Sequence, residues 1–461
     1  MALVGAYALP HPPLAIPGVG RGQERGIGRT LESFDEVSRE IADLAPETII
    51  FITPHNVIYA DYFHISPDKS ASGDFTRFGD FATRLEAIFD AELAEKISVL
   101  AELGGIPAGG LGTGDKKLDH GVTVPMWFID RRYSGYKTVR ISQSGMGPSE
   151  HYRLGRLIAE ASEATGRKTV LIASSDMSHK LKADGPYGFA PEGPEFDGAA
   201  AQAMSDGDFL SLFNIDRSLR ERAAECGYNS LMVLAGCFDK RRVDARLLSY
   251  EGPFGVGYAV ASFKPGEPDE SRNFLEQYTD AALKSARKSR DGEDEYRALA
   301  RYSLEYTVKH GSEAPMPEAT SGGLTGGRAG VFVSLYKDGA LRGCVGTISP
   351  TTENIAREII QNAVSAGLRD NRFEPVSEEE LPYLKYKVDV LAAPEPIAGP
   401  EELDVVRYGV IVTSGHRRGL LLPNLDGVDS VDEQISIARR KAGIPEGTPV
   451  DLERFEVVRH E

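Results

Sequence analysis

Short apolar runs that end in a polar loop with a histidine recur along the first half of the chain. Residues 47–56, ETIIFITPHN, contain consecutive apolar positions followed by a proline and His55. A β-branched run bounded by proline is typical of a strand buried on both faces, because proline has no N–H with which to continue the pairing. We therefore predict a strand here, with His55 just beyond its carboxyl end, where open α/β folds hold their ligands.

The same arrangement occurs twice more. Residues 2–9 form an apolar run that leads to His11, and residues 169–174 form a run that is followed by His179. A single loop histidine is as often structural as functional. Three recurrences favour a shared site over coincidence.

A helical pattern separates the first two predicted strands. Apolar residues recur at helical spacing over Thr30–Leu44, and strand, helix and strand in this order indicate a βαβ unit with parallel strands. His11 and His55 should therefore emerge at the same edge of one sheet. We also predict a single helix over Ala82–Leu103, and a closing pair of strands near residue 250. The first domain is thus expected to be α/β, a mixed sheet with flanking helices.

The second half of the chain has a different order of predicted strands and helices. Strands and helices mix there without βαβ alternation, which indicates a smaller α+β domain. Residues 265–292 are rich in charge and poor in apolar side chains, which is typical of a solvated linker. We therefore predict domains over residues 1–264 and 293–461.

Composition excludes several classes of protein. The 461 residues carry a net charge of −17, which argues against a nucleic-acid binder, since such proteins need a basic face. Three cysteines without CxxC spacing exclude a disulfide framework and suit the cytoplasm. Without an apolar run of about 18 residues, we expect no membrane partner. A homo-oligomer is compatible with the sequence.

Five segments of the first half together resemble the class III extradiol ring-cleavage dioxygenases, the group of the protocatechuate 4,5-dioxygenase beta subunit. They are PHPPLAIPGVG, ITPHN, DHGVTVPMW, SSDMSHKL and ECGYNSLMVLAG, and they fall within residues 1–264. The related Memo family shares much of this fold. The resemblance implies an oxidoreductase with one non-haem Fe(II), which acts on a small catechol-like aromatic substrate and dioxygen.

The resemblance also implies roles for five residues. His11 and His55 correspond to the two histidine ligands of the iron, and Glu225 corresponds to the carboxylate ligand. His179 corresponds to the acid/base histidine, and His120 to the histidine that hydrogen-bonds substrate and oxygen. Two imidazoles and one carboxylate leave adjacent positions open on Fe(II), so a catechol and dioxygen can bind side by side.

The sequence departs from the dioxygenase pattern at the third metal ligand. Cys226 follows Glu225 directly, and Memo-like proteins carry a cysteine at the corresponding place as a metal ligand. With Cys226 as a ligand the site would be softer, and it would suit zinc, copper or iron without oxygenase activity. A lone cysteine is more often a small buried residue, so we expect Glu225 to be the ligand and keep Cys226 as the alternative.

The second half resembles the AMMECR family through LRGCVGTISP, RFEPVSEEELPYLKYKVDVL and GLLLPN. That family implies a fold without a settled activity. Cys344, between two glycines, is either an accessible thiol or a packed cysteine, and His416 is expected in a solvent-facing turn.

A Memo-like half joined to an AMMECR half resembles proteins of the AmmeMemoRadiSam system. The chain lacks the three-cysteine cluster motif of a radical S-adenosylmethionine enzyme, so we expect it to be the partner of such an enzyme.

Overall fold

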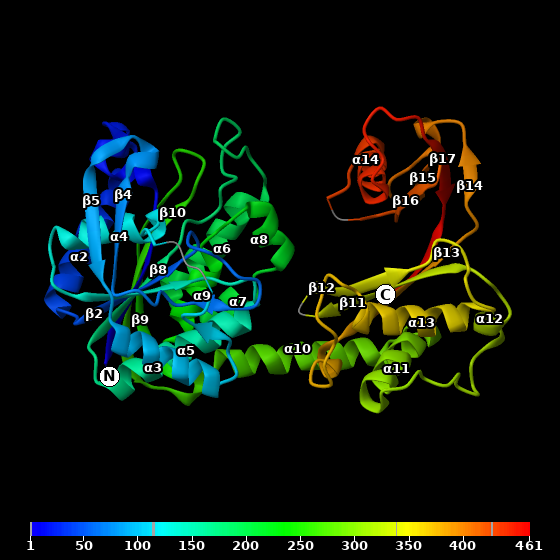
Figure 1. Cartoon of the computed structure of the whole chain (residues 1–461), viewed down its shortest axis with the longest axis horizontal. Coiled ribbons are helices and arrows are strands. Elements are labelled where there is room, and N and C mark those ends of the chain that lie inside the picture. The colour runs from blue at the N-terminus through cyan, green and yellow to red at the C-terminus, as the bar shows by residue number, and fades with distance from the viewer. Residues whose placement is uncertain (1, 113–115, 338, 426) are drawn as a thin grey trace. The chain divides into compact units, whose positions relative to one another are not determined.

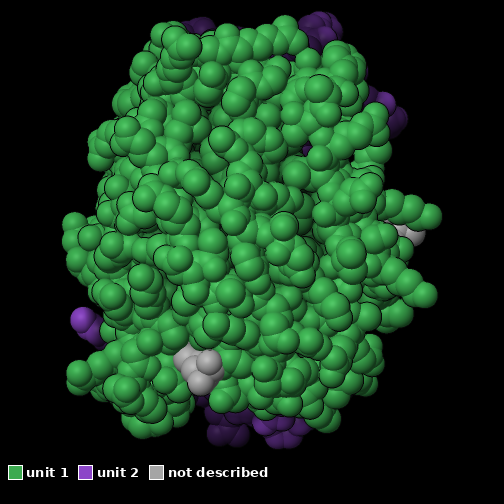
Figure 2. Space-filling model, turned by 90° about the vertical axis from the view of Figure 1, so that its left-hand side faces the viewer, with its two compact units in different colours: residues 1–279 green, residues 280–461 purple. Residues whose placement is uncertain are grey.

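The computed structural model describes residues 2–112, 116–337, 339–425 and 427–461. It divides into two compact units, residues 1–279 and 280–461 (Figure 2).

The first unit is built on a six-stranded mixed sheet, which confirms the predicted α/β fold class. The strand order is β7-β2-β8-β1-β10-β9. The first four strands in this order are parallel, and the last two are antiparallel to their neighbours. Two further two-stranded sheets, β3-β6 and β4-β5, lie outside it. The strands are β1 Leu3–Leu9, β2 Thr48–Thr53, β3 Phe63–His64, β4 Ser70–Phe75, β5 Asp80–Ile88, β6 Ala108–Gly109, β7 Lys137–Ser142, β8 Thr169–Ser174, β9 Arg241–Glu251 and β10 Tyr258–Pro268.

Helices cover both faces of this sheet (Figure 1). The central strands are buried over their whole length, and alternate residues enter two cores. Ile50 and Ile52 of β2 pack with α3, α5, α6 and α9, whereas Ile49 and Phe51 pack with α2 and α4. The helices are α1 Pro17–Gly20, α2 Gly28–Leu44, α3 Ala91–Leu103, α4 His120–Asp130, α5 Pro148–Thr165, α6 Glu192–Asp206, α7 Phe209–Phe213, α8 Arg217–Ala223, α9 Tyr228–Gly236 and α10 Phe274–Asp291.

The prediction of one helix over residues 82–103 was wrong for its first part. Residues 80–88 form strand β5, which pairs with β4, and only residues 91–103 form helix α3. Leu85 and Ala87 are buried between exposed neighbours, so this segment follows the period of two of a strand. Asp90 then begins the helix, because its side chain accepts a hydrogen bond from the N–H of Leu93.

The segment expected to be a linker, residues 265–292, contains the end of β10 and helix α10. Phe274, near the start of this helix, is buried in the core of the first unit, where its ring meets that of Phe209 edge-on. Apolar residues at the start of α10 therefore anchor it to the first unit, although the sequence around them is highly charged.

The second unit is α+β. One antiparallel sheet has the order β12-β11-β13-β18 and packs against α11 and α13, and a second, β14-β17-β15-β16, packs against α14. Its elements are α11 Glu295–His310, α12 Gly322–Thr325, β11 Gly330–Lys337, β12 Ala340–Gly346, α13 Ile355–Leu368, β13 Lys385–Leu391, β14 Glu395–Ile397, β15 Gly409–Ser414, β16 Arg417–Leu421, α14 Val431–Ala442, β17 Asp451–Phe455 and β18 Val457–His460. In the described part of the chain, every helix is too short or too polar to cross a membrane.

Candidate metal centre

The site lies where three neighbouring parallel strands end. Strands β2, β8 and β1 are adjacent in the sheet, so their carboxyl ends lie along one edge. Each strand places a polar side chain two residues after its last position: His55 after β2, Asp176 after β8 and His11 after β1. The repeated run-then-polar pattern in the sequence is thus one structural feature repeated on adjacent strands.

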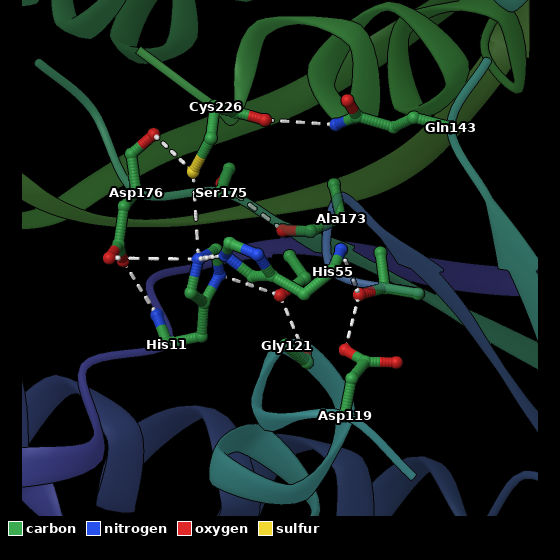
Figure 3. Close-up of polar contacts among 11 residues, drawn as sticks. His11, His55, Asp119, Gly121, Gln143, Ala173, Ser175, Asp176 and Cys226 are labelled. Carbon is green, nitrogen blue, oxygen red and sulfur yellow. Dashed lines mark hydrogen bonds and ion pairs between the residues drawn. The ribbon is translucent and has the colours of Figure 1, made fainter. Parts of the chain in front are cut away.

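Two histidines and one cysteine direct their donor atoms toward one another (Figure 3). The Nε2 atoms of His11 and His55 are 2.9 Å apart, and the Sγ of Cys226 lies 3.6 Å from Nε2 of His11. All three donor atoms lie within 4.8 Å of one another, and this is the one such group of His, Cys, Asp and Glu among the residues that the structure describes. The three residues are therefore able to hold a metal ion.

The pKa values of the site histidines are lowered, which favours the neutral ring that a metal ion requires. Burial, reinforced by neighbouring imidazoles, lowers the pKa of His11 well below its ordinary value. Burial likewise lowers the pKa of His55 and that of His120 to about 4. The ring of His120 stacks on His55 with centroids 4.0 Å apart and meets His11 edge-on at 5.4 Å. The predicted residue His120 is thus beside the donor atoms.

His179 faces the same site from the loop after β8. Its backbone N–H donates to the carbonyl of Ala223, and its ring meets Tyr187 edge-on at 5.1 Å. It is close enough for a charge on its ring to lower the pKa of His11 and of His55. The predicted residue His179 is thus a fourth imidazole near the donor atoms.

Glu225 is partly buried, and its carboxylate is engaged away from the donor atoms. Its carboxylate accepts a hydrogen bond of 2.7 Å from the N–H of Tyr228 in the first turn of α9, and burial raises its pKa to about 7. The next residue, Cys226, turns its thiol toward His11. Of the two residues proposed as the third ligand, the structure brings Cys226 to the histidines and places Glu225 at the helix terminus.

Asp176 is a site residue that the sequence analysis did not single out. Its Oδ1 accepts a hydrogen bond of 2.7 Å from the N–H of His11, and its Oδ2 lies 3.6 Å from Nε2 of His11. Burial raises the pKa of this carboxyl group to about 7. The signal was present in the sequence, because Asp176 follows its strand at the same distance as His11 and His55 follow theirs.

The two candidates in the second unit lie outside any such group. The thiol of Cys344 on β12 accepts a hydrogen bond from Ser334 at 3.2 Å, and its carbonyl accepts one from Arg372. His416 is exposed in the turn between β15 and β16. Neither belongs to a metal-binding group among the described residues.

Two protein-family models match the two units separately, and one relative matches the whole chain. Residues 5–261 match the family described as the catalytic LigB subunit of aromatic ring-opening dioxygenase, and residues 297–460 match AMMECR1. The Clostridium acetobutylicum protein CA_C1420 is 42% identical over 470 residues, which cover 100% of this chain and 99% of its own. A Thermotoga maritima protein is 48% identical over 171 residues, 37% of this chain and 98% of its own. The solved structure of the Pyrococcus horikoshii protein PH0010 is 32% identical, with a TM-score of 0.34, over 36% of this chain and 88% of that one.

Proposed function

The chain belongs to the family of the catalytic LigB subunit of aromatic ring-opening dioxygenase, with an AMMECR1 domain after it, and on this premise we propose that its first unit is a metal-dependent oxidoreductase. In this proposal His11, His55 and Cys226 hold one transition-metal ion. The observation that supports it most strongly is the convergence of these three donor atoms within 4.8 Å.

The donor set suits a redox-active ion. Imidazole is a good ligand for copper, iron and zinc, and a thiolate shifts the preference toward softer ions such as copper and zinc. When bound, such an ion supplies electron transfer and polarises a ligand oxygen. We propose copper or iron as the working metal, because zinc has no redox chemistry.

The chain's own residues complete the site. His120 and His179 bring two further imidazoles next to the donor atoms, and burial lowers the pKa of both. A neutral imidazole can donate one hydrogen bond and accept another, so each can hold a bound molecule and pass it a proton. The aromatic ring of Phe78 lies against His120 and that of Tyr187 against His179, so each imidazole has an aromatic neighbour.

A second candidate function is extradiol cleavage of a catechol-like aromatic at Fe(II), with Glu225 as the carboxylate ligand. The family match favours it, since the description of that family is a ring-opening dioxygenase subunit. It requires a carboxylate oxygen of Glu225 to reach the histidines, whereas in this structure the carboxylate accepts a hydrogen bond from the N–H of Tyr228.

The experiment is to measure the metal content of anaerobically purified wild type, Cys226→Ala and Glu225→Gln after reconstitution with iron, copper or zinc. Glutamine keeps an oxygen that can accept the hydrogen bond from Tyr228, so Glu225→Gln tests ligation with little effect on helix α9. We expect about one ion per chain in wild type and Glu225→Gln, and loss of the ion in Cys226→Ala. Loss in Glu225→Gln with retention in Cys226→Ala would overturn the proposal in favour of the second candidate, which oxygen uptake with a panel of catechols then tests.

The fusion of the two domains supports a proposal about partners. We propose that the chain serves a radical S-adenosylmethionine enzyme, as its resemblance to the AmmeMemoRadiSam system implies. Anaerobic copurification of the chain with such an enzyme from the same genome tests this. Separate elution of the two proteins at micromolar concentration would count against it.

A further inference from the structure

The hydroxyl of Ser174 links the metal centre to the first turn of helix α4. Ser174 is the last residue of β8 and is fully buried. Its Oγ lies 2.8 Å from Nδ1 of His11 and 2.6 Å from the carbonyl oxygen of Gly121. One hydroxyl thus joins a metal-binding histidine to the residue that follows His120.

The direction of these two hydrogen bonds follows from the chemistry of the groups. A serine hydroxyl has a single hydrogen to donate, and a backbone carbonyl can only accept. Ser174 therefore donates to Gly121 and accepts from His11. The hydrogen on the neutral ring of His11 must then be on Nδ1.

We propose that Ser174 is a positioning residue that fixes His11 in its metal-binding tautomer, an inference that rests on the metal site proposed above. With its hydrogen on Nδ1, His11 carries a free lone pair on Nε2. That atom is the one that lies 2.9 Å from Nε2 of His55 and 3.6 Å from the Sγ of Cys226. In the other tautomer Nε2 would carry a hydrogen and could not bind a metal ion.

His55 is expected in the other tautomer, with its hydrogen on Nε2. Since Nε2 of His11 has no hydrogen, the contact of 2.9 Å between the two rings requires His55 to donate from its own Nε2 in the metal-free protein. Among the described residues, the Nδ1 of His55 has no hydrogen-bond partner, so only the contact with His11 sets its tautomer in the metal-free protein. His11 is therefore the preset ligand, and His55 is the ligand that changes tautomer when an ion binds.

Gly121 allows its own backbone carbonyl to approach the hydroxyl of Ser174 closely. A Cβ at this position would lie 2.5 Å from Oγ1 of Thr53 and 3.1 Å from Oγ of Ser174. The absence of a side chain lets its carbonyl reach Ser174 and engage the one hydrogen of the hydroxyl. Ser174 is left to act only as an acceptor toward His11.

The first experiment determines tautomers in the metal-free full-length protein at neutral pH. Long-range proton–nitrogen NMR correlations of isotope-labelled histidine distinguish the two neutral tautomers, and a His11→Ala variant assigns the signal. We expect the Nδ1–H form for His11 in wild type. In Ser174→Ala, where Nδ1 loses its acceptor, we expect a large population of the Nε2–H form.

The second experiment measures Co²⁺ and Zn²⁺ affinity in the same variants. Loss of an outer hydrogen-bond partner of a metal-binding histidine typically costs 10–100-fold in affinity, and we expect about that loss in Ser174→Ala. Ser175→Ala is the matched control, because Ser175 is equally buried and its hydroxyl bonds the carbonyl of Ala173, away from the ligands. Ser174→Thr keeps the hydroxyl and should restore both the tautomer and the affinity.

The outcomes separate this inference from the proposed function. An Nε2–H tautomer of His11 in wild type would overturn the inference, and this measurement does not depend on the folding of any Ser174 variant. An unchanged tautomer and affinity in Ser174→Ala would also overturn it. If the predicted tautomers are found but wild type binds no ion, the proposed function fails while the assignment of Ser174 stands.

Discussion

Gly227 is predicted to control the position of the Cys226 thiol. A Cβ added at Gly227 would lie 2.6 Å from both the carbonyl oxygen of Asp176 and the Cβ of Ser175. The backbone of Gly227 has φ −92°, which any residue can adopt, so the effect of Gly227→Ala is purely steric. The glycine allows the cysteine loop to pack directly on the turn that follows β8.

The size of the effect follows from these contacts. Ordinary van der Waals contact begins near 3.4 Å, so the loop must retreat by about 0.8 Å. The atoms that it meets belong to the backbone or to a fixed Cβ, and side-chain rotation therefore brings no relief. Metal–ligand distances tolerate only about 0.2 Å. We expect Gly227→Ala to weaken metal binding roughly 10–100-fold, and overpacking to lower the free energy of unfolding by about 1–3 kcal/mol.

The assay is a titration with Co²⁺ that follows the thiolate-to-metal absorption band, together with urea unfolding. Gly198→Ala is the control, because Gly198 lies within helix α6 and a Cβ there meets nothing within 4 Å. It should leave metal affinity unchanged and raise the free energy of unfolding by about 0.5–1 kcal/mol. Wild-type affinity and an intact absorption band in Gly227→Ala would refute the argument that this packing positions Cys226.

Three further predictions concern stability. Burial raises the pKa of Asp197 to about 6, so the stability that its protonated form contributes is complete below pH 3.8 and is lost as the pH rises through 6. Relative to Asp197→Asn, the wild-type free energy of unfolding should fall by up to about 3 kcal/mol between pH 4 and pH 7, and parallel pH profiles would contradict this. Burial alone would raise the pKa of Glu380, but its hydrogen bonds with Arg342 lower it to about 2. Glu380→Gln should therefore destabilise the second unit above pH 4.5, with a difference that disappears as the pH falls through 2 in acid titrations followed by circular dichroism. Phe274→Ala should lower the free energy of unfolding of the first unit by about 3–5 kcal/mol; an effect near zero in urea unfolding would mean that the start of α10 is not part of its core.

The pattern of apolar runs was sufficient to predict the main features of the first unit. Continuous apolar strands must be buried on both faces, and a helix between them makes the strands parallel, so their carboxyl ends share one edge. The gathering of His11 and His55 follows from this arrangement, whereas His120 joins them from the first turn of α4. Local pattern was not sufficient for residues 80–88, where the pairing of β5 with β4 prevails over a helix-like composition.

Only the tertiary structure shows which of Glu225 and Cys226 turns its side chain toward the histidines. The two residues are adjacent, and sequence position does not determine which side chain a tight loop turns toward a site. Packing of Gly227 on Ser175 and Asp176 sets the path of the backbone, which brings the thiol to His11 and leaves the carboxylate at the N-terminus of α9. The tautomer of His11 is decided in the same way, because it depends on a hydroxyl and a carbonyl that are distant in the sequence and meet only in the folded chain.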